Sequence, residues 1–285
     1  MTSPTADRGG WSDLERPPLD ARALRRALQV GEPGSWWQRL DVVDSTGSTN
    51  ADLAAAARSG AAGVVGATGA AVLVAEHQHA GRGRLDRSWR APPRSALTLS
   101  VLVHPQVPAA RWPWLPLLTG VAVAETVRRV AGLDAVLKWP NDVLVDDRKL
   151  AGVLLERVET PAGAAAVIGI GLNVTAGHAE LPVPAATSLA FEGAASTDRQ
   201  PILVHLLRTL QALHSAWVEG AEGLHASYLR RCSTVGRQVR VELPDGGAVV
   251  GLAETVDADG RLVVATATGR HTLAVGDVRH VHAAE

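Results

Sequence analysis

The segment 81–89, GRGRLDRSW, combines positive charge with backbone freedom directly after an apolar run. Its two glycines let the backbone turn tightly and approach a ligand closely, and successive backbone N–H groups in such a turn can bind an anion. Guanidinium groups suit carboxylate or phosphate, and the tryptophan offers a flat face for a base. The segment indicates a site for an acid and a nucleotide, and a solvated basic loop with a core tryptophan explains it equally well. The candidate residues are Gly81, Arg82, Gly83, Arg84, Arg87 and Trp89.

A second group of candidate residues lies in KWPND, residues 138–142. Lys138 can neutralise an anion, while Asn141 and Asp142 can bind a ligand or hold Mg²⁺; the alternative is a β-bulge with a locally satisfied Asn and Asp. Lys149 follows in RKLAGVLLE, where a turn lysine is the alternative. The chain contains no other lysine although it is rich in arginine, and arginine does not replace a compact ammonium. Their placement therefore favours a specific use of both lysines over chance.

Polar residues also occur at the ends of two predicted elements. Ser48, Thr49 and Asn50 in GSTN present two hydroxyls and an amide that could bind neutral polar groups, although a helix cap explains Ser48 or Thr49 equally well. Asn173 closes the apolar run GIGLNV, as a ligand-binding residue or as a turn residue.

Three common site types do not match the sequence. GRGRLDRS lacks the spacing of a P-loop, and GIGLNV lacks the dinucleotide fingerprint GxGxxG. His77 and His79 flank Gln78, but no further Cys, His or acidic spacing completes a zinc site. We interpret both histidines as non-ligands.

The composition is typical of a soluble globular protein. A length of 285 residues predicts about two domains, and a net charge of −1 argues against a globally basic nucleic-acid binder. The single cysteine, Cys232, excludes an intramolecular disulfide. We expect a cytoplasmic protein, because the N-terminus lacks a signal pattern and no apolar run reaches the roughly 18 residues of a membrane span.

The elements that must position these residues follow from periodicity and turn signals. A tail over 1–18 is expected to be disordered, and Asp20 to cap a helix within 19–30. Strands are predicted within 36–50, at 71–76, over 95–105, in three pieces over 135–160 and over 164–174, and helices over 48–60, 112–132 and 200–231. The result is an α+β domain over 19–232, a mixed or antiparallel sheet with helices on one face. Short alternating strands predict a β-barrel of about five strands over 233–285.

The series GSTN, EHQHAGRGRLDRSW, KWPNDV, RKLAGVLLE, GIGLNV and ATSL closely resembles the bacterial biotin protein ligases. The resemblance runs from about Val42 through the catalytic domain, and the terminal barrel resembles the family's SH3-like C-terminal domain. It implies a two-step reaction. The carboxylate of biotin attacks the α-phosphate of ATP, which is accompanied by Mg²⁺, to give biotinyl-5′-AMP and pyrophosphate. A lysine of a biotin carboxyl carrier domain then attacks the mixed anhydride and releases AMP.

The resemblance also implies roles for the candidate residues. Arg82 and Lys138 would hold the carboxylate and the α-phosphate, and Asp142 and Lys149 would act in the second step or beside the phosphates, with Mg²⁺ near Asp142. The biotin-binding group would comprise Ser48, Thr49, Asn50, Gln78, Gly81, Arg82, Gly83, Arg84 and Lys138. The ATP- or adenylate-binding group would comprise Arg84, Arg87, Trp89, Asn141 and Asn173, with Trp89 stacking near adenine. The loop 81–89 would close over the adenylate, which predicts that it is mobile without ligand.

Expected partners follow from the same resemblance. Carrier domains of acyl-CoA carboxylases are the expected acceptors, and the chain is expected to be a monomer or a weak, ligand-linked homodimer that binds no membrane. No sequence-specific DNA binding is expected, because one helix at 19–30 cannot form a winged helix-turn-helix. The alternatives are a lipoate-protein ligase or octanoyltransferase, and a non-enzymatic biotin-binding regulator.

Overall fold

The computed structural model describes residues 16–64, 69–85, 87–220 and 223–280. The helices are α2 (Ala21–Ala27), α3 (Thr49–Arg58), α4 (Trp114–Thr126), α5 (Arg199–Val218) and α6 (Leu224–Leu229). The strands are β1 (Trp37–Val43), β2 (Ala70–Ala75), β3 (Ala96–Val103), β4 (Val136–Lys138), β5 (Asp142–Val145), β6 (Arg148–Thr160), β7 (Gly163–Asn173), β8 (Gln238–Glu242), β9 (Ala248–Val256), β10 (Leu262–Thr266), β11 (Gly269–Leu273) and β12 (Asp277–His280). Single 3₁₀ turns lie at Ala109–Arg111 and His178–Glu180, and a π-helical turn at Val127–Ala131 extends α4.

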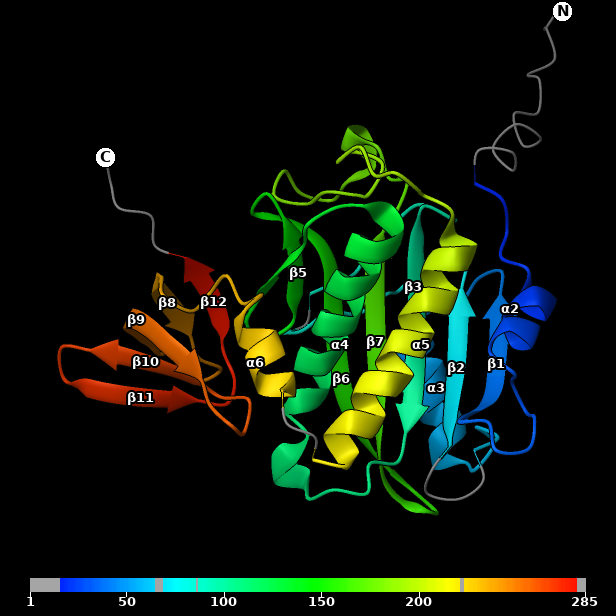
Figure 1. Ribbon diagram of the computed structural model, residues 1–285, viewed down its shortest axis with the longest axis horizontal. Coiled ribbons are helices and arrows are strands. Elements are labelled where there is room, and N and C mark those ends of the chain that lie inside the picture. The colour runs from blue at the N-terminus through cyan, green and yellow to red at the C-terminus, as the bar shows by residue number, and fades with distance from the viewer. Residues whose placement is uncertain (1–15, 65–68, 86, 221–222, 281–285) are drawn as a thin grey trace, which may run out of the picture.

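Seven strands form the larger sheet, in the order β1-β2-β3-β7-β6-β5-β4. β1 and β2 are parallel, and every other neighbouring pair is antiparallel. The predicted mixed sheet is therefore confirmed. Long β6 and β7 lie at its centre, where apolar residues are buried on both faces (Figure 1).

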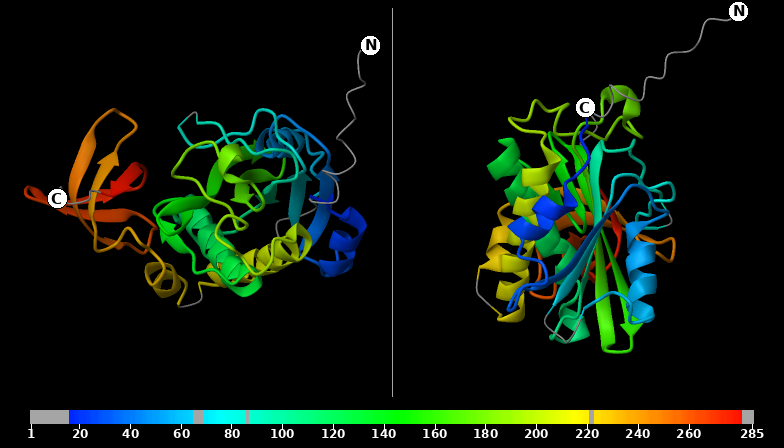
Figure 2. Two further views of the ribbon diagram at one scale, coloured as in Figure 1. Left: turned by 90° about the horizontal axis from the view of Figure 1, so that it is seen from above. Right: turned by 90° about the vertical axis from the view of Figure 1, so that its right-hand side faces the viewer.

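Helices cover both faces of this sheet, so the prediction of helices on one face is wrong (Figure 2). α4 and α5 pack on one face over the main core. α3 packs on the other face, where Leu53, Ala54 and Ala57 meet Leu102 and Val167 in a separate cluster. The GSTN motif predicted where α3 starts. The apolar residues of α3 are mostly alanines, and their weak pattern did not predict which face of the sheet the helix covers.

Local capping signals were predicted correctly. Asp20 accepts a hydrogen bond from the backbone N–H of Ala23 and caps α2, and Ser48 caps α3. The helical segment predicted over 200–231 is instead divided into α5 and α6, which are separated by a left-handed glycine, Gly223.

The tail predicted as disordered over 1–18 lies, up to residue 15, outside the described residues. Arg16 and Pro17 make specific contacts: Arg16 pairs with Glu180 at 2.6 Å, and the carbonyl of Pro17 accepts a bond from Arg199. Arg199 is buried against Glu76. These partners are far away in sequence, so composition alone could not reveal them.

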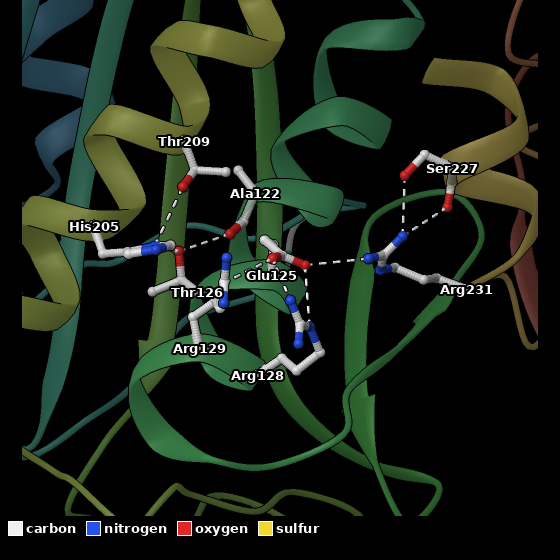
Figure 3. A network of polar contacts seen from close by, with 9 residues as sticks. All are labelled: Ala122, Glu125, Thr126, Arg128, Arg129, His205, Thr209, Ser227 and Arg231. Carbon is white, nitrogen blue, oxygen red and sulfur yellow. Dashed lines mark hydrogen bonds and ion pairs between the residues drawn. The ribbon is translucent and has the colours of Figure 1, made fainter. Parts of the chain in front are cut away.

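A polar network joins α4 to its neighbouring helices (Figure 3). Glu125 on α4 pairs with Arg128 at 2.6 Å and with Arg231, beyond α6, at 3.1 Å. The next residue, Thr126, contacts Nδ1 of His205 on α5 at 3.2 Å. The network fixes the segment after α6, which leads into the C-terminal domain.

The C-terminal domain is a five-stranded antiparallel sheet in the order β11-β10-β9-β8-β12. Its strand number and alternating burial agree with the prediction. Two tryptophans anchor it to the larger domain: Nε1 of Trp114 donates to the carbonyl of Ala258, and Nε1 of Trp139 donates to that of Gly260. In the described chain, no helix is long and apolar enough to cross a membrane.

Candidate functional site

A cavity of about 790 Å³ opens over the centre of the larger sheet, beside the C-terminal domain. It is enclosed by the start of α3, the segment 82–90, strands β5 to β7, the segment 182–186 and the start of β12. Most sequence-predicted site residues line it together: Ser48, Thr49, Asn50, Gln78, Arg82, Gly83, Arg84, Arg87, Trp89, Asn141, Asp142, Lys149 and Asn173. Gly81 and Lys138 are not among the lining residues.

The segment 81–89 forms a short hairpin closed by its own backbone. Trp89 N donates to Gly81 O at 2.8 Å, and Gly83 N donates to Arg87 O at 2.7 Å. A Cβ at Gly81 would lie only 2.5 Å from the carbonyl oxygen of Trp89, so this close approach requires glycine. Leu85 stands at the tip with φ +52° and is 53% exposed. Residue 86 lies outside the described residues, and the mobility of the loop stays a prediction.

Trp89 lies on a floor made of glycines. A Cβ at Gly171 of β7 would lie 2.6 Å from Cζ2 of Trp89, and one at Gly152 of β6 would lie 3.6 Å from Cζ3. Trp89 Nε1 is buried and has no hydrogen-bond partner in the described chain. Because glycine has no side chain, Gly152 and Gly171 leave room for the indole ring of Trp89 directly on the sheet.

Lys149 and Asp142 form an ion pair of 2.6 Å in the cavity wall. The antiparallel pairing of β5 with β6 brings them together, since Asp142 faces Gly152 and Leu144 faces Lys149. A Cβ at Gly152 would lie 3.2 Å from Nζ of Lys149, so this lysine too uses space that glycine leaves free.

Arg84 connects the hairpin to two other parts of the site. Its guanidinium donates to Oδ1 of Asn141 at 3.1 Å and to the carbonyl of Gly276 at 3.2 Å. Burial lowers the pKa of Arg84 below its ordinary value, although Asp277 and Asp142 act in the opposite direction. Nδ2 of Asn141 is held by Val153 O at 2.9 Å, so the KWPND turn is tied to β6.

The C-terminal domain reaches the cavity through Asp277. Its carboxylate accepts a bond of 2.5 Å from Arg87, which raises the pKa of Arg87. Burial alone would raise the pKa of Asp277, but the bond from Arg87 and the positive charges of Arg87, Lys138 and Arg84 lower it below its usual value. Lys138 therefore acts electrostatically on this edge of the cavity from outside its lining.

A chain of polar groups runs beneath the other end. Oε1 of Gln78 accepts from the backbone N of Thr49 at 2.7 Å, and Ser100 lies between Thr49 and Asn50 at 2.7 and 2.5 Å. Asn50 Nδ2 then meets Glu156 at 2.7 Å. Arg82 meets the same carboxylate oxygen at 2.8 Å.

Asn173 lies at the end of β7 and lines the cavity. Its Nδ2 donates to the carbonyl of Thr187 at 2.9 Å. This bond uses one of the two protons of Nδ2, and Oδ1 is an acceptor that suits the exocyclic amine of a base.

Sequence reasoning missed several site residues. Asp277 and Glu156 gave no local signal, because their importance depends on contacts across the fold. The glycines did give a signal: Gly169 and Gly171 are two apart in an apolar strand and so share a face. GIGLNV pointed to Asn173, but the open face that its glycines leave on the sheet was not predicted.

Comparisons with known proteins agree with this architecture. The sequence matches the Biotin/lipoate A/B protein ligase family over residues 66–173 and the Biotin protein ligase C terminal domain over 234–281. The Biotin--[acetyl-CoA-carboxylase] ligase of Mycobacterium tuberculosis is 45% identical over 94% of this chain and 98% of its own length. The Bifunctional ligase/repressor BirA of Escherichia coli is 32% identical over 67% of this chain and 60% of its own. In fold, the chain is similar to the biotin protein ligase from Aquifex aeolicus in complex with biotin and ATP, with a TM-score of 0.71 and 23% identity over 86% of this chain and 100% of that structure.

Proposed function

Because the chain belongs to the biotin protein ligase family, we propose that it activates biotin with ATP and transfers the biotinyl group to a carrier-protein lysine. The carboxylate of biotin attacks the α-phosphate of ATP, pyrophosphate leaves, and biotinyl-5′-AMP forms. The neutral ε-amine of the acceptor lysine then attacks the acyl carbon, AMP leaves, and the amide is formed with loss of a proton. The acceptor is a biotin carboxyl carrier domain of an acyl-CoA carboxylase, as the name of the M. tuberculosis relative indicates for that protein.

The observation that carries the proposal is the gathering of cations from separate segments around one cavity. The first step brings two anions together, so their repulsion must be cancelled at the point of attack. Arg82 and Arg84 come from the hairpin, and Lys149 comes from β6. A cavity that only binds a neutral ring has no need of three converging cations.

The geometry favours Lys149 over Lys138 for direct contact with the reacting groups. Lys149 stands in the wall with its ammonium beside Asp142, whereas Lys138 does not line the cavity. We therefore exchange the roles that the sequence suggested for the two lysines: Lys149, together with Arg82, meets the carboxylate and the α-phosphate. Lys138 contributes positive charge near Asp277, whose pKa it helps to lower.

The two ends of the cavity differ in chemistry. Trp89, on its glycine floor, and Asn173, with a free acceptor, form the end proposed for adenine. Ser48, Thr49, Asn50 and Gln78 form the end proposed for the ring of biotin.

Mg²⁺ enters with ATP in this proposal. The described residues contain no group of three or more His, Cys, Asp or Glu that could hold a metal ion. Asp142 is a cavity carboxylate beside the amide of Asn141, and oxygen donors are what Mg²⁺ prefers. These two residues could supplement the phosphate oxygens, and the ion would neutralise phosphate charge there.

The test is incubation with ATP, Mg²⁺, labelled biotin and a biotin carboxyl carrier domain, with each component omitted in turn. Pyrophosphate release should need only biotin, ATP and Mg²⁺, and label should reach the carrier only in the complete mixture. Transfer of lipoate with no transfer of biotin would overturn the proposal.

The lysine assignment is tested separately. Lys149→Arg should reduce pyrophosphate release more than Lys138→Arg does, since only the former changes the cavity wall. Pre-made adenylate then measures the second step alone. A larger loss for Lys138→Arg would return the direct role to Lys138.

A further inference from the structure

We propose that Glu156 and Ser100, which do not line the cavity, are positioning residues for the end proposed for the ring of biotin. They determine which side-chain atoms at that end donate hydrogen bonds to a ligand and which accept them. The inference rests on the proposed function, because it concerns how that end distinguishes the ring of biotin from an apolar ring. Its basis is the chain Gln78–Thr49–Ser100–Asn50–Glu156, whose three middle members are buried and whose donors can be assigned.

The assignment begins at Glu156. A carboxylate only accepts, so the atom of Asn50 that lies 2.7 Å from it must be the donor Nδ2. The amide oxygen of Asn50 then faces Ser100 Oγ at 2.5 Å. A Cβ at Gly169 would lie 3.0 Å from Cγ of Asn50, so the amide is seated closely on the sheet and its orientation has consequences.

The orientation of the Asn50 amide determines the direction of the next hydrogen bond, at Ser100. Asn50 is 3% exposed and Ser100 is wholly buried, so these groups depend on each other for partners. Ser100 has one proton and gives it to the oxygen of Asn50. It also contacts Thr49 Oγ1 at 2.7 Å, and Thr49 donates its own proton to Oε1 of Gln78 at 3.0 Å. Thr49 has then used its proton, and what it offers the cavity is a lone pair.

Gln78 is fixed in the same way. The backbone N–H of Thr49 can only donate, so the atom of Gln78 at 2.7 Å is Oε1, and Nε2 is left for the cavity. Oε1 of Gln78 also accepts from Thr49 Oγ1 at 3.0 Å, so two bonds from Thr49 hold this amide oxygen toward that residue.

The cavity consequently presents an acceptor at Thr49 and donors at Gln78. This pair is the complement of a cyclic urea, whose N–H donates and whose C=O accepts. A dithiolane ring has neither group. A site built to bond polar ligand groups rejects analogues that lack them, because its own buried groups are then unpaired.

Arg82 shares the anchoring oxygen, which links the polarity of this end to the hairpin. Its Nη2 lies 2.8 Å from Glu156 Oε2, the atom that also accepts from Asn50. Glu156 thus fixes the position of Asn50, at the end proposed for the ring of biotin, relative to Arg82, a cation of the proposed reaction centre.

The test exchanges donor and acceptor. Asn50→Asp places two carboxylates in contact, which should lower kcat/KM for biotin by about tenfold or more. Adding Glu156→Gln restores a donor–acceptor pair at the same spacing, and Ser100 still donates to position 50. Arg82 loses its acceptor in the double variant, because it contacts the same oxygen of Glu156. The double variant should therefore recover the ratio of kcat/KM for biotin to that for lipoate to within about threefold of wild type, and not the full rate.

The readout is the ratio of kcat/KM for biotin to that for lipoate in pyrophosphate release. Asn50→Asp should lower this ratio and the double variant should restore it, while general loss of structure would lower both rates alike. Retained ATP affinity in Asn50→Asp reports that the variant is folded. Glu159→Gln is the matched control on the same strand, since Glu159 is exposed and pairs with exposed Arg157.

A ratio of kcat/KM for biotin to that for lipoate that is lowered equally in the single and double variants would overturn the inference, as would an unchanged ratio in Asn50→Asp. Both results leave the proposed function intact provided that the wild-type protein joins biotin to the carrier. A wild-type protein that releases no pyrophosphate with biotin would instead overturn the proposed function.

Discussion

Gly171→Ala should damage the ATP-binding end of the site and spare the biotin-binding end. A Cβ at this position would lie 2.6 Å from Cζ2 of Trp89, well inside van der Waals contact. The other neighbour of the ring on this floor, Gly152, belongs to a central strand that cannot move away. Trp89 must therefore leave its place whenever the alanine methyl occupies it.

The magnitude follows from the cost of overfilling a packed site, about 1–3 kcal/mol. Each 1.4 kcal/mol corresponds to tenfold, so KM for ATP should rise by about 5- to 150-fold. The assay is pyrophosphate release with ATP varied at saturating biotin, and then with biotin varied at saturating ATP. Gly171→Ala should raise KM for ATP less in a Trp89→Phe background than in the wild type, because the smaller ring leaves room for the methyl.

Gly169→Ala is the matched control, two residues earlier on the same face of β7. Its Cβ would lie 3.0 Å from Cγ of Asn50, so it should raise KM for biotin and leave KM for ATP nearly unchanged. The reasoning is refuted if Gly171→Ala changes KM for ATP by less than twofold, or if both substitutions raise the same KM.

Three further predictions concern other parts of the molecule. Burial lowers the pKa of His214 to about 4, so the proton binds more tightly to the unfolded chain. The free energy of unfolding should therefore fall by about 3 kcal/mol as the pH falls from about 6.5 to about 4. His214→Leu should remove this pH dependence in urea unfolding. Asp277→Asn should raise KM for ATP severalfold, because Arg87 loses the partner that positions it, and should make KM more dependent on salt, because the charge of Arg87 is no longer compensated. Glu76→Gln should destabilise the protein by about 3–5 kcal/mol in denaturant unfolding, because Arg199 would be left buried and charged without its partner.

Each of these predictions has a control. A urea midpoint that falls equally with pH in wild type and in His214→Leu would assign the pH dependence to other groups. Glu242→Gln changes an exposed carboxylate of the C-terminal sheet that pairs with Arg279, and an equal rise in KM for ATP there would argue against a local role of Asp277. Glu159→Gln should cost well under 1 kcal/mol as an exposed pair, and a similar small cost for Glu76→Gln would contradict the buried-pair argument.

The sequence predicted what depends on neighbours along the chain. Asp20 and Ser48 cap helices because capping joins residues three apart, and the central strands follow from continuous apolar runs. The motifs also identified most of the cavity wall, because strand ends and tight turns bring their side chains to one edge. Lys138 and Lys149 show the limit: their spacing suggested a shared site, and the strand pairing sets Lys138 opposite Asp142, but only the side-chain contacts show that Lys149 is the one paired with Asp142 in the cavity wall.

The residues that sequence reasoning missed share a physical cause. Glu156 looks like an ordinary polar residue of a long strand, and its meaning arises only from contacts with Asn50 and Arg82, which lie 106 and 74 residues away. The face covered by α3 was missed for a similar reason: small alanines pack against β3 and β7 without a strong apolar stripe. Long-range contacts of this kind leave no periodic signal.

The C-terminal sheet is better understood as part of the active site than as an appendage. Arg84 donates to Gly276 O and Arg87 pairs with Asp277, so two cations of the hairpin are held by the turn that opens β12. Trp139, inside the KWPND motif, donates through Nε1 to Gly260 O of the same sheet. Both basic motifs are thus fixed from one side by a domain that supplies little of the cavity wall. Arg84 and Arg87 are positioned by contacts that cross the domain boundary, and removal of the C-terminal sheet would leave the cavity lined but these two arginines without their contacts to Gly276 and Asp277.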